Sequence, residues 1–328
     1  MASDGSGFTA ESAGLSAQRD PRAIVYLGLM VLIGSCTAPA ARYVVQELPL
    51  GLIPLLRFGI AGLCLLPIAW RMDGFHRMIR QDWKRLALTA ALCVPINQSF
   101  FLSGARLAPT THVALIYSAC PLIVLALATA LRQEQFVPGR LLGVLLSMAG
   151  LCVIALGNVA TSNASVAWGD LLLIGAVISW GAYLTVGKPL IGRYGSFPVL
   201  AGTFLFGGLF EVPIALATSP FWGKLSEVSA QAWGALAFLT LIVSILALLF
   251  QNLAMQRLDA SQVATFGNVS PLLTIVWGYL LFGDRITSTL IWGGALIFLG
   301  LLGAARSAPK PLLVHRPTKR LMRVPVEV

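Results

Sequence analysis

The sequence predicts an all-α membrane protein in which ten transmembrane helices form two inverted five-helix repeats. Three observations carry this prediction: the high hydrophobicity, the length of the apolar runs, and a second half that repeats the first. Of the 328 residues, 57% are hydrophobic and 11% are charged, whereas soluble domains carry about 25% charged residues. A soluble fold could not cover so much apolar side chain with polar surface, so the composition implies a lipid environment.

Ten apolar runs follow one another along the chain, and each approaches the roughly 20 residues that a spanning helix needs. Their length favours helices over a membrane barrel, whose strands alternate in segments of about ten residues. Short linkers between the runs hold most of the charge. The runs occupy residues 24–41, 51–70, 83–105, 109–131, 138–156, 168–186, 197–217, 230–253, 260–282 and 286–304.

Polar tails flank the apolar part of the chain. Residues 1–22 lack the basic segment, apolar core and cleavage site of a secretory signal, and residues 305–328 are basic and contain no apolar span. We expect both to be flexible tails on the cytoplasmic side. Between them, residues 23–157 form the predicted first repeat and residues 168–304 the second.

Lysine and arginine are shared unevenly between the two sets of linkers. With the N-terminus inside, 18 of them lie on the inner side and four on the outer side, while Arg57 falls within an apolar run. Cytoplasmic loops carry such an excess, so both termini are predicted to be cytoplasmic in a multi-pass protein of the plasma (inner) membrane. The net charge of +10 therefore indicates topology and contact with lipid. No nucleic-acid partner and no obligate protein partner is predicted.

The second half repeats the first in a shared register. HVALIYSACPLIV, from residue 112, aligns at an offset of 150 with QVATFGNVSPLLT, from residue 262. An odd number of helices in each repeat would turn the second copy upside down. Halves of opposite orientation can open a central site to one side and then the other. The matched pairs are Pro121 with Pro271, Glu134 with Asp284, Gly143 with Gly293, Gly150 with Gly300 and, at offset 146, Gly62 with Gly208.

Three stretches resemble a known family. PLLRFGIAGL, RLAPTTHVALIYSACPLIVLALATALRQEQ and its copy RLDASQVATFGNVSPLLTIVWGYLLFGDRIT are similar to the EamA-type ten-helix carriers of the drug/metabolite transporter superfamily. The resemblance implies a basket-like fold with the third, fourth, eighth and ninth helices around a central cavity. It also implies export of amino acids or related metabolites. One departure is visible, because the first copy ends in RQEQ where the family usually has Gly-Glu-Arg.

Two adjacent amides, Asn97 and Gln98, lie deep in the third run. On a helix that the resemblance places at the cavity, they could bind substrate. The alternative is hydrogen bonding between helices, which contributes about 0.6 kcal/mol on average in one measured membrane protein. Because adjacent residues point about 100° apart on a helix, we expect one of the two to contact substrate.

Two prolines, Pro121 and Pro271, lie near the middle of repeat-related helices and cannot donate to the carbonyls of Tyr117 and Gly267. Freed carbonyls suit a cavity wall, and the prolines suit a bend or gating hinge. A structural kink without a ligand role is the alternative. The polar neighbours Ser118 and Asn268 are also repeat mates, and they complete the predicted substrate-binding set with Tyr117, Gly267, Asn97, Gln98 and Trp180.

Two charges fall inside apolar runs. Arg57 lies about 9 Å inside the second helix, and Glu211 lies at a similar depth in the seventh. We predict that they form a structural ion pair, because an intramembrane carboxylate needs a partner; the alternative for Arg57 is snorkelling to the headgroups. Trp180 and its neighbour Tyr183 could stack on a substrate or serve in packing.

The sequence excludes several function classes. It contains no HExxH, GxSxG or Walker motif, and its five cysteines are scattered without the spacing of a disulfide framework or zinc site. No metal, cofactor or catalytic residue is predicted. The prediction is a secondary transporter that moves a small neutral, zwitterionic or amphipathic metabolite, amino-acid-like, outward by alternating access. A passive channel and, less favoured, an intramembrane enzyme are the alternatives.

Overall fold

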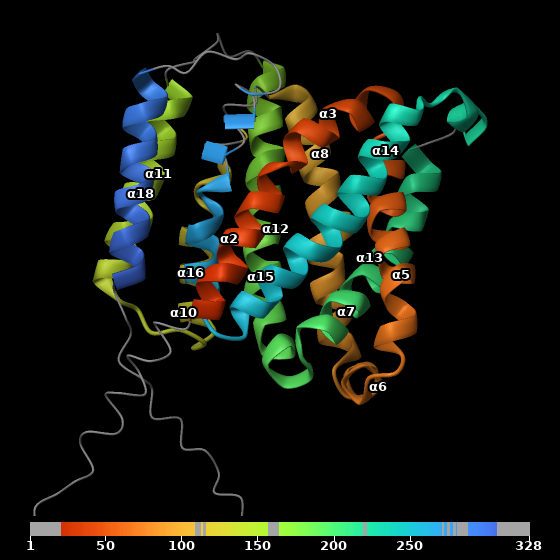
Figure 1. Cartoon of the computed structure of the whole chain (residues 1–328), viewed down its shortest axis with the longest axis horizontal. Helices are drawn as coiled ribbons and strands as arrows, with labels where there is room; N and C mark the ends of the chain where they lie inside the picture. The colour runs from red at the N-terminus through yellow and green to blue at the C-terminus, as the bar shows by residue number, and fades with distance from the viewer. Residues whose placement is uncertain are drawn as a thin grey trace, which may run out of the picture.

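A computed structural model of the chain describes residues 21–108, 113, 116–156, 164–218, 222–270, 272–273, 276–277, 280 and 288–306. Throughout this part the regular elements are helices (Figure 1). The long helices stand side by side as a bundle, which confirms the all-α class that the composition predicts.

The described helices of the first half follow the predicted apolar runs. Prolines accompany two of the π-helical segments: Pro54 directly precedes η1, and Pro95 lies inside η2. A proline cannot donate the usual helical hydrogen bond, so the backbone adjusts locally. The elements are α2 (Pro21–Ser35), α3 (Thr37–Glu47), α4 (Leu52–Pro54), η1 (Leu55–Gly59), α5 (Ile60–Ala69), α6 (Asp73–Gln81), α7 (Trp83–Ala91), η2 (Leu92–Ile96), α8 (Asn97–Leu107), α10 (Cys120–Ala130) and α11 (Pro138–Leu156).

The second half begins with the longest described helix and contains another π-helical segment, η4. Its helices again coincide with the apolar runs, within a few residues at most ends. They are α12 (Ala164–Tyr194), α13 (Ser196–Thr218), η3 (Trp222–Glu227), α14 (Ala230–Phe238), η4 (Leu239–Ala247), α15 (Leu248–Met255), α16 (Ala260–Gly267) and α18 (Ser288–Arg306).

Six of the described helical stretches are long and apolar enough to cross a membrane. Their length follows from the uninterrupted apolar runs, since about 20 residues at 1.5 Å each span the hydrocarbon layer. Two shorter apolar helices, Cys120–Ala130 and Ile291–Ala304, accompany them. The six stretches are Pro21–Glu47, Leu52–Ala69, Trp83–Leu107, Ala164–Tyr194, Ser196–Thr218 and Ala230–Met255.

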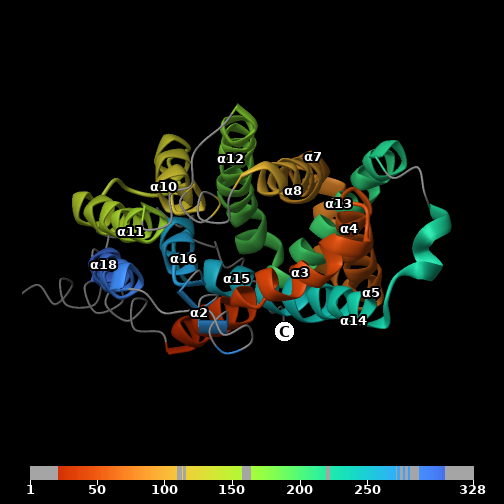
Figure 2. The same cartoon turned by 90° about the horizontal axis from the view of Figure 1, so that it is seen from above.

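Two repeat-related pairs of glycines meet where α11 packs on α18: Gly143 faces Gly300, and Gly150 faces Gly293. A methyl group at Gly143 would lie 2.4 Å from the nitrogen of Ala304 and 2.7 Å from the carbonyl oxygen of Gly300. One at Gly150 would lie 2.5 Å from the carbonyl oxygen of Gly293. Residue numbers rise along one helix as they fall along the other, so the two helices are antiparallel. The matched glycines thus form a self-complementary contact between the repeats, and Figure 2 shows the two helices side by side.

The same arrangement recurs where α5 and η1 pack on α13. A methyl group at Gly62 would lie 2.8 Å from the nitrogen of Leu205, and one at Gly208 would lie 2.7 Å from the Cα atom of Gly59. These residues are mates at offset 146, and they again meet in antiparallel order. The offset differs from 150 because the linkers of the two repeats differ in length.

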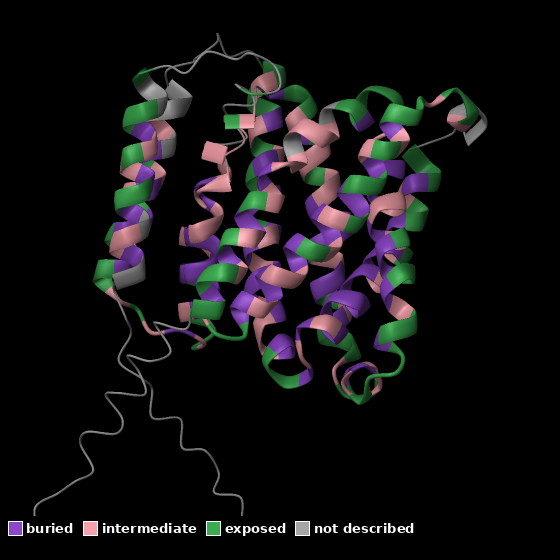
Figure 3. Cartoon of the chain, in the orientation of Figure 1, coloured by how far each residue is buried: buried purple, intermediate pink, exposed green. Residues whose placement is uncertain are grey.

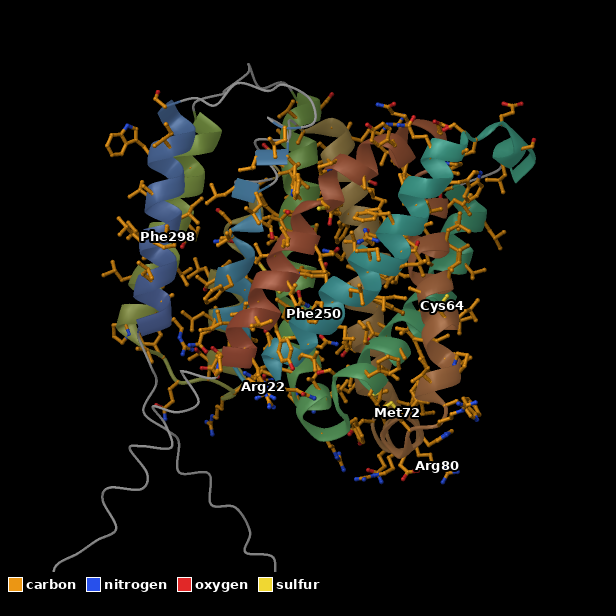
Figure 4. The ribbon with its side chains drawn as sticks, viewed as in Figure 1. Arg22, Cys64, Met72, Arg80, Phe250 and Phe298 are labelled. Carbon is orange, nitrogen blue, oxygen red and sulfur yellow. The ribbon has the colours of Figure 1, made fainter. Side chains whose placement is uncertain are left out.

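Burial and charge are distributed as a membrane bundle requires. Buried residues concentrate on the helix faces that turn toward one another, and exposed apolar residues lie on the outer faces (Figure 3). Arg22 and Arg80 lie at the same end of the bundle (Figure 4). We call this end, which also carries Lys188 and Arg193, the basic end.

Candidate functional site

The helix that begins at Cys120 and the helix that ends at Gly267 are interrupted at repeat-related positions. Residues 118–119 and 268–269 form turns, each followed again by helix. Ala119 N donates to the Ile116 carbonyl at 3.1 Å, and Val269 N donates to the Phe266 carbonyl at 3.0 Å. The two breaks therefore share a backbone pattern at an offset of 150.

Pro121 explains the first of these breaks. It lies in the first turn of α10, where its missing N–H costs no intrahelical hydrogen bond. The predicted bend is thus a full interruption, after which a new helix begins. Pro271, the mate of Pro121 and the other predicted hinge, lies outside the described residues.

The two breaks touch each other. Asn268 Nδ2 donates to the carbonyl oxygen of Ser118 at 3.3 Å, and both residues are buried. Donor and acceptor are repeat mates, so the pseudo-twofold axis of the protein passes close to this hydrogen bond. Beside it, a methyl group at Gly267 would meet no atom within 4 Å. Four of the predicted site residues, Tyr117, Ser118, Gly267 and Asn268, therefore surround one point of contact between the repeats.

Asn97 connects three helices. It is the first residue of α8, directly after the π-helical segment η2, and it is 2% exposed. Its Nδ2 donates to the Ala176 carbonyl on α12 at 2.8 Å and to the Tyr117 hydroxyl at 3.2 Å. Gln98 Nε2 donates to Asn97 Oδ1 at 2.9 Å. The interhelical hydrogen bonding that the sequence leaves as an alternative is thus present, and it joins Asn97 to the residue before the first break.

Aromatic rings border this polar group. The Tyr117 ring packs edge-on against Phe101 with 5.5 Å between centroids. Trp180 and Tyr183 have centroids 5.0 Å apart, so their rings contact each other as well as being near in sequence. Trp180 is half-buried, whereas Tyr183 is buried. The site therefore combines neutral hydrogen-bonding groups with flat apolar surfaces.

The predicted ion pair of Arg57 with Glu211 is not formed in this conformation. Arg57 Nε donates instead to Ser244 Oγ in η4 at 2.6 Å, and Glu211 has no cation partner in the part of the chain that the structure describes. The reason is rotational. Gly62 faces α13, and Arg57, five residues earlier, points about 140° away from it on a helix, toward η4.

A second amide pair belongs to the same region but is not among the predicted residues. Gln251 and Asn252 are buried in α15, and Tyr183 lies close to both Gln251 and Cys93. Gln251 Nε2 and Asn252 Oδ1 have no hydrogen-bond partner among the described residues. The sequence does carry a signal for them: the pair QN at 251–252 mirrors NQ at 97–98, and each pair follows a π-helical segment.

At the basic end, an exposed network joins the α6–α7 connection to the end of α12. Asp82 Oδ2 accepts from the Tyr194 hydroxyl at 2.6 Å and from Arg193 Nη1 at 2.7 Å. The hydrogen bond from Tyr194, followed by the charge of Arg193, lowers the pKa of Asp82. A lowered carboxyl pKa stabilises the folded state above the ordinary aspartate pKa and loses this effect as the pH falls below it. This contact therefore persists at neutral pH.

The described residues contain no group of three or more histidine, cysteine or acidic side chains that could hold a metal ion. The five cysteines are free thiols, two of them buried. The chemistry of the site is thus that of amides, hydroxyls, backbone carbonyls and aromatic rings.

Comparison with known proteins agrees with this architecture. The model of the EamA-like transporter family matches residues 21–156 and 167–306. The uncharacterized transporter YyaM of Bacillus subtilis is 25% identical over 86% of this chain and 92% of its own length. An uncharacterized transporter of Archaeoglobus fulgidus is 22% identical over 84% of this chain and 94% of its own. A solved structure titled "Crystal structure of protein" shares the fold, with a TM-score of 0.74 at 20% identity, covering 87% of this chain and 97% of that one.

Proposed function

Because the chain belongs to the EamA-like transporter family and is a membrane transporter rather than an enzyme, we propose that it is a secondary carrier. It moves a small zwitterionic or amphipathic metabolite, amino-acid-like, by alternating access between two inverted repeats of five helices each. The observation that carries this proposal is the contact between the two helix breaks, Asn268 with Ser118, at the junction of the repeats.

Interrupted helices suit a transport site for a physical reason. Backbone groups that leave a helix need other partners, and inside a membrane they find them only where protein or a wet cavity supplies them. Carriers with inverted repeats bind substrate where such helices meet. Tyr117, Ser118, Gly267 and Asn268 are the proposed binding residues at the breaks, with Asn97, Gln98 and Trp180 around them. Pro121 and Pro271 are the proposed hinges.

The chemistry of these residues supports a substrate with both polar and apolar parts. Amides and hydroxyls bind an amino or carboxyl group, and Trp180 and Tyr117 offer surfaces for an apolar side chain. Arg57 adds a positive charge whose nearest described polar partner is a neutral hydroxyl, Ser244. Such a set favours an amino acid or a related compound over a bare anion or a bare cation.

The orientation and direction of transport complete the proposal. The 18-to-4 excess of lysine and arginine on one side supports cytoplasmic termini in the plasma membrane, which makes the basic end cytoplasmic. Outward transport is proposed from the resemblance to metabolite exporters. A passive channel is the competing function, and it differs from a carrier in having no obligatory alternation.

The binding site can be tested with purified protein and a library of small metabolites. A substrate raises the unfolding temperature, because it binds the folded state alone. For the best ligand, we expect Asn268→Ala to weaken binding about fivefold or more, as loss of one hydrogen bond of about 1 kcal/mol requires.

The matched control is Ser147→Ala. Ser147 Oγ also donates to a carbonyl of its repeat mate, Ile297, at 3.3 Å, but in the contact of α11 with α18. This variant should bind the ligand with unchanged affinity. Equal affinity of Asn268→Ala and the unmodified protein would show that the helix breaks do not belong to the binding site.

A further inference from the structure

A partly buried cluster of charged residues joins the two repeats at the basic end. Arg140 Nη1 lies 3.1 Å from Glu134 Oε2, and Arg140 Nη2 lies 2.9 Å from Asp259 Oδ2. The side chains of Arg140 and Glu134 are both 0% exposed. Lys188 Nζ lies 3.4 Å from Asp259 Oδ1 and donates to the Leu258 carbonyl at 2.7 Å. We call Glu134, Arg140, Lys188, Asp259 and Ser261 the inter-repeat cluster.

Local backbone geometry positions Glu134. The helix α10 ends at Ala130, and Arg132, just beyond it, has a φ of 55°. Gln133 N donates to the Ala128 carbonyl, and Arg132 N donates to the Thr129 carbonyl. This pattern is a Schellman cap, which turns the chain sharply away from the helix axis. The turn directs Glu134 toward the second repeat.

The carboxylate of Glu134 meets the start of α16. Ser261 N donates to Glu134 Oε1 at 3.1 Å, and Ser261 Oγ donates to Glu134 Oε2. Asp259 is the N-cap of α16 and forms a capping box with Gln262. A carboxylate from the first repeat therefore accepts from the N-terminus of a helix of the second repeat, where the helix dipole favours negative charge.

Arg140 holds both sides of this contact. It comes from the first turns of α11, in the first repeat, and its guanidinium also donates to Ser261 Oγ at 3.1 Å. The rigid planar fork of arginine presents its donors in fixed directions toward several acceptors, whereas the donors of a lysine ammonium rotate about one point charge. Glu134 and Arg140 belong to the first repeat, whereas Lys188, Asp259 and Ser261 belong to the second.

We propose that the inter-repeat cluster is the gate of the basic end, closed in this conformation. The inference rests on the proposed carrier function. Helices α10 and α16 lead from the two breaks to this end, and the cluster ties their ends together there. A substrate can pass between the breaks and the basic end only after Glu134 and Arg140 have separated from Ser261 and Asp259.

The gate is reversible because its charges have alternative partners. Glu134 and Arg140 form an ion pair with each other within the first repeat, and Asp259 is paired with Lys188 within the second. Separation of the repeats thus leaves no isolated charge in the bundle, which would be strongly unfavourable.

The test uses a reporter cysteine that opening of the gate should expose. Ala128 is 0% exposed and lies one turn before the Schellman cap. In a background whose five native cysteines are replaced by alanine, Ala128→Cys is alkylated with a polar maleimide. The protein is in nanodiscs, so both faces of the membrane are accessible.

Glu134→Gln and Arg140→Lys should each accelerate the alkylation about tenfold, as a shift of the closed-to-open equilibrium by one order of magnitude requires. Glu134→Gln keeps the shape and the acceptor oxygen, and it carries the test alone if Arg140→Lys does not fold. Arg193→Gln, which breaks the exposed ion pair with Asp82 at the same end, is the matched control and should leave the rate unchanged.

A second reporter separates gating from loss of structure. Ala61 is also 0% exposed, but it lies in α5. Unchanged alkylation at Ala128→Cys, or equal acceleration at Ala128→Cys and Ala61→Cys, would overturn the proposal. Alkylation needs no substrate, so this test can reject the proposed gate without rejecting the proposed transport function. Conversely, a protein that transports no tested substrate can still show the accelerated alkylation.

Discussion

Arg57 illustrates how one residue can be positioned by the packing of its own helix. Gly62 allows the close approach of α13, which leaves the arginine to point toward η4. Its Nε bonds Ser244 Oγ, and its guanidinium lies 5.0 Å from the centre of the Phe58 ring. Both contacts are neutral. A charge within a spanning helix is costly unless something compensates it, and the carboxylate of a bound substrate would do so.

We therefore expect Arg57→Gln to discriminate between ligands. Hydrogen bonds to a charged group contribute about 1.5–3 kcal/mol, so affinity for a substrate carboxylate should fall about 10- to 100-fold. The amide or ester of the same substrate should bind the variant and the parent equally. Arg57→Lys, which keeps the charge without the fork, should give an intermediate loss, measured by titration calorimetry. An equal loss for the charged and neutral ligands would show that Arg57 acts only through the structure.

At the scale of helices, two helix pairs show the twofold symmetry that relates the repeats. The helices α11 and α18, and likewise α5 and α13, meet in antiparallel order through glycines that belong to repeat-related pairs. Small residues let two helix backbones approach closely, which is how helices associate without a hydrophobic driving force between them. The glycines thus explain why the register of the repeat is visible in the sequence.

Enlarging one of these glycines should destabilise the bundle. In Gly143→Ala the new methyl group would lie 2.4 Å from the backbone of Ala304, and such overpacking costs about 1–3 kcal/mol. The control is Gly28→Ala, where the methyl group would meet nothing within 4 Å. Thermal unfolding in detergent should show a lower midpoint for Gly143→Ala alone. Equal midpoints would contradict the close packing of α11 on α18.

The helices themselves could be predicted from apolar run length, because the length of a spanning helix is set by the membrane. Pro138–Leu156 coincides with its predicted run. For the break near Pro121 the sequence predicts only a bend, since a proline shows where a helix is disturbed but not how far. The partners of the polar side chains could not be predicted in this way. The contacts of Arg140 with Asp259 and of Arg57 with Ser244 depend on the rotation of helices that are distant in sequence, which apolar periodicity does not determine.

At the scale of the whole molecule, the charge bias makes a direct prediction of topology. Gln81 lies at the basic end and Ser226 in η3, in the linker between α13 and α14, and both are exposed. In a cysteine-free background, Ser226→Cys in intact cells should react with an impermeant maleimide, whereas Gln81→Cys should react only after the cells are opened. The reverse labelling pattern would show that the protein has the opposite orientation in the membrane, with the inter-repeat cluster on the outer side.

Under the proposed function, the closed basic end and the meeting of the two helix breaks belong to one of the two conformations between which the carrier alternates. Counterflow tests this most directly. Purified protein in proteoliposomes preloaded with unlabelled substrate should take up labelled substrate faster than empty proteoliposomes do, because a loaded carrier returns faster than an empty one. Uptake at the same rate with and without internal substrate would contradict alternating access and identify a channel.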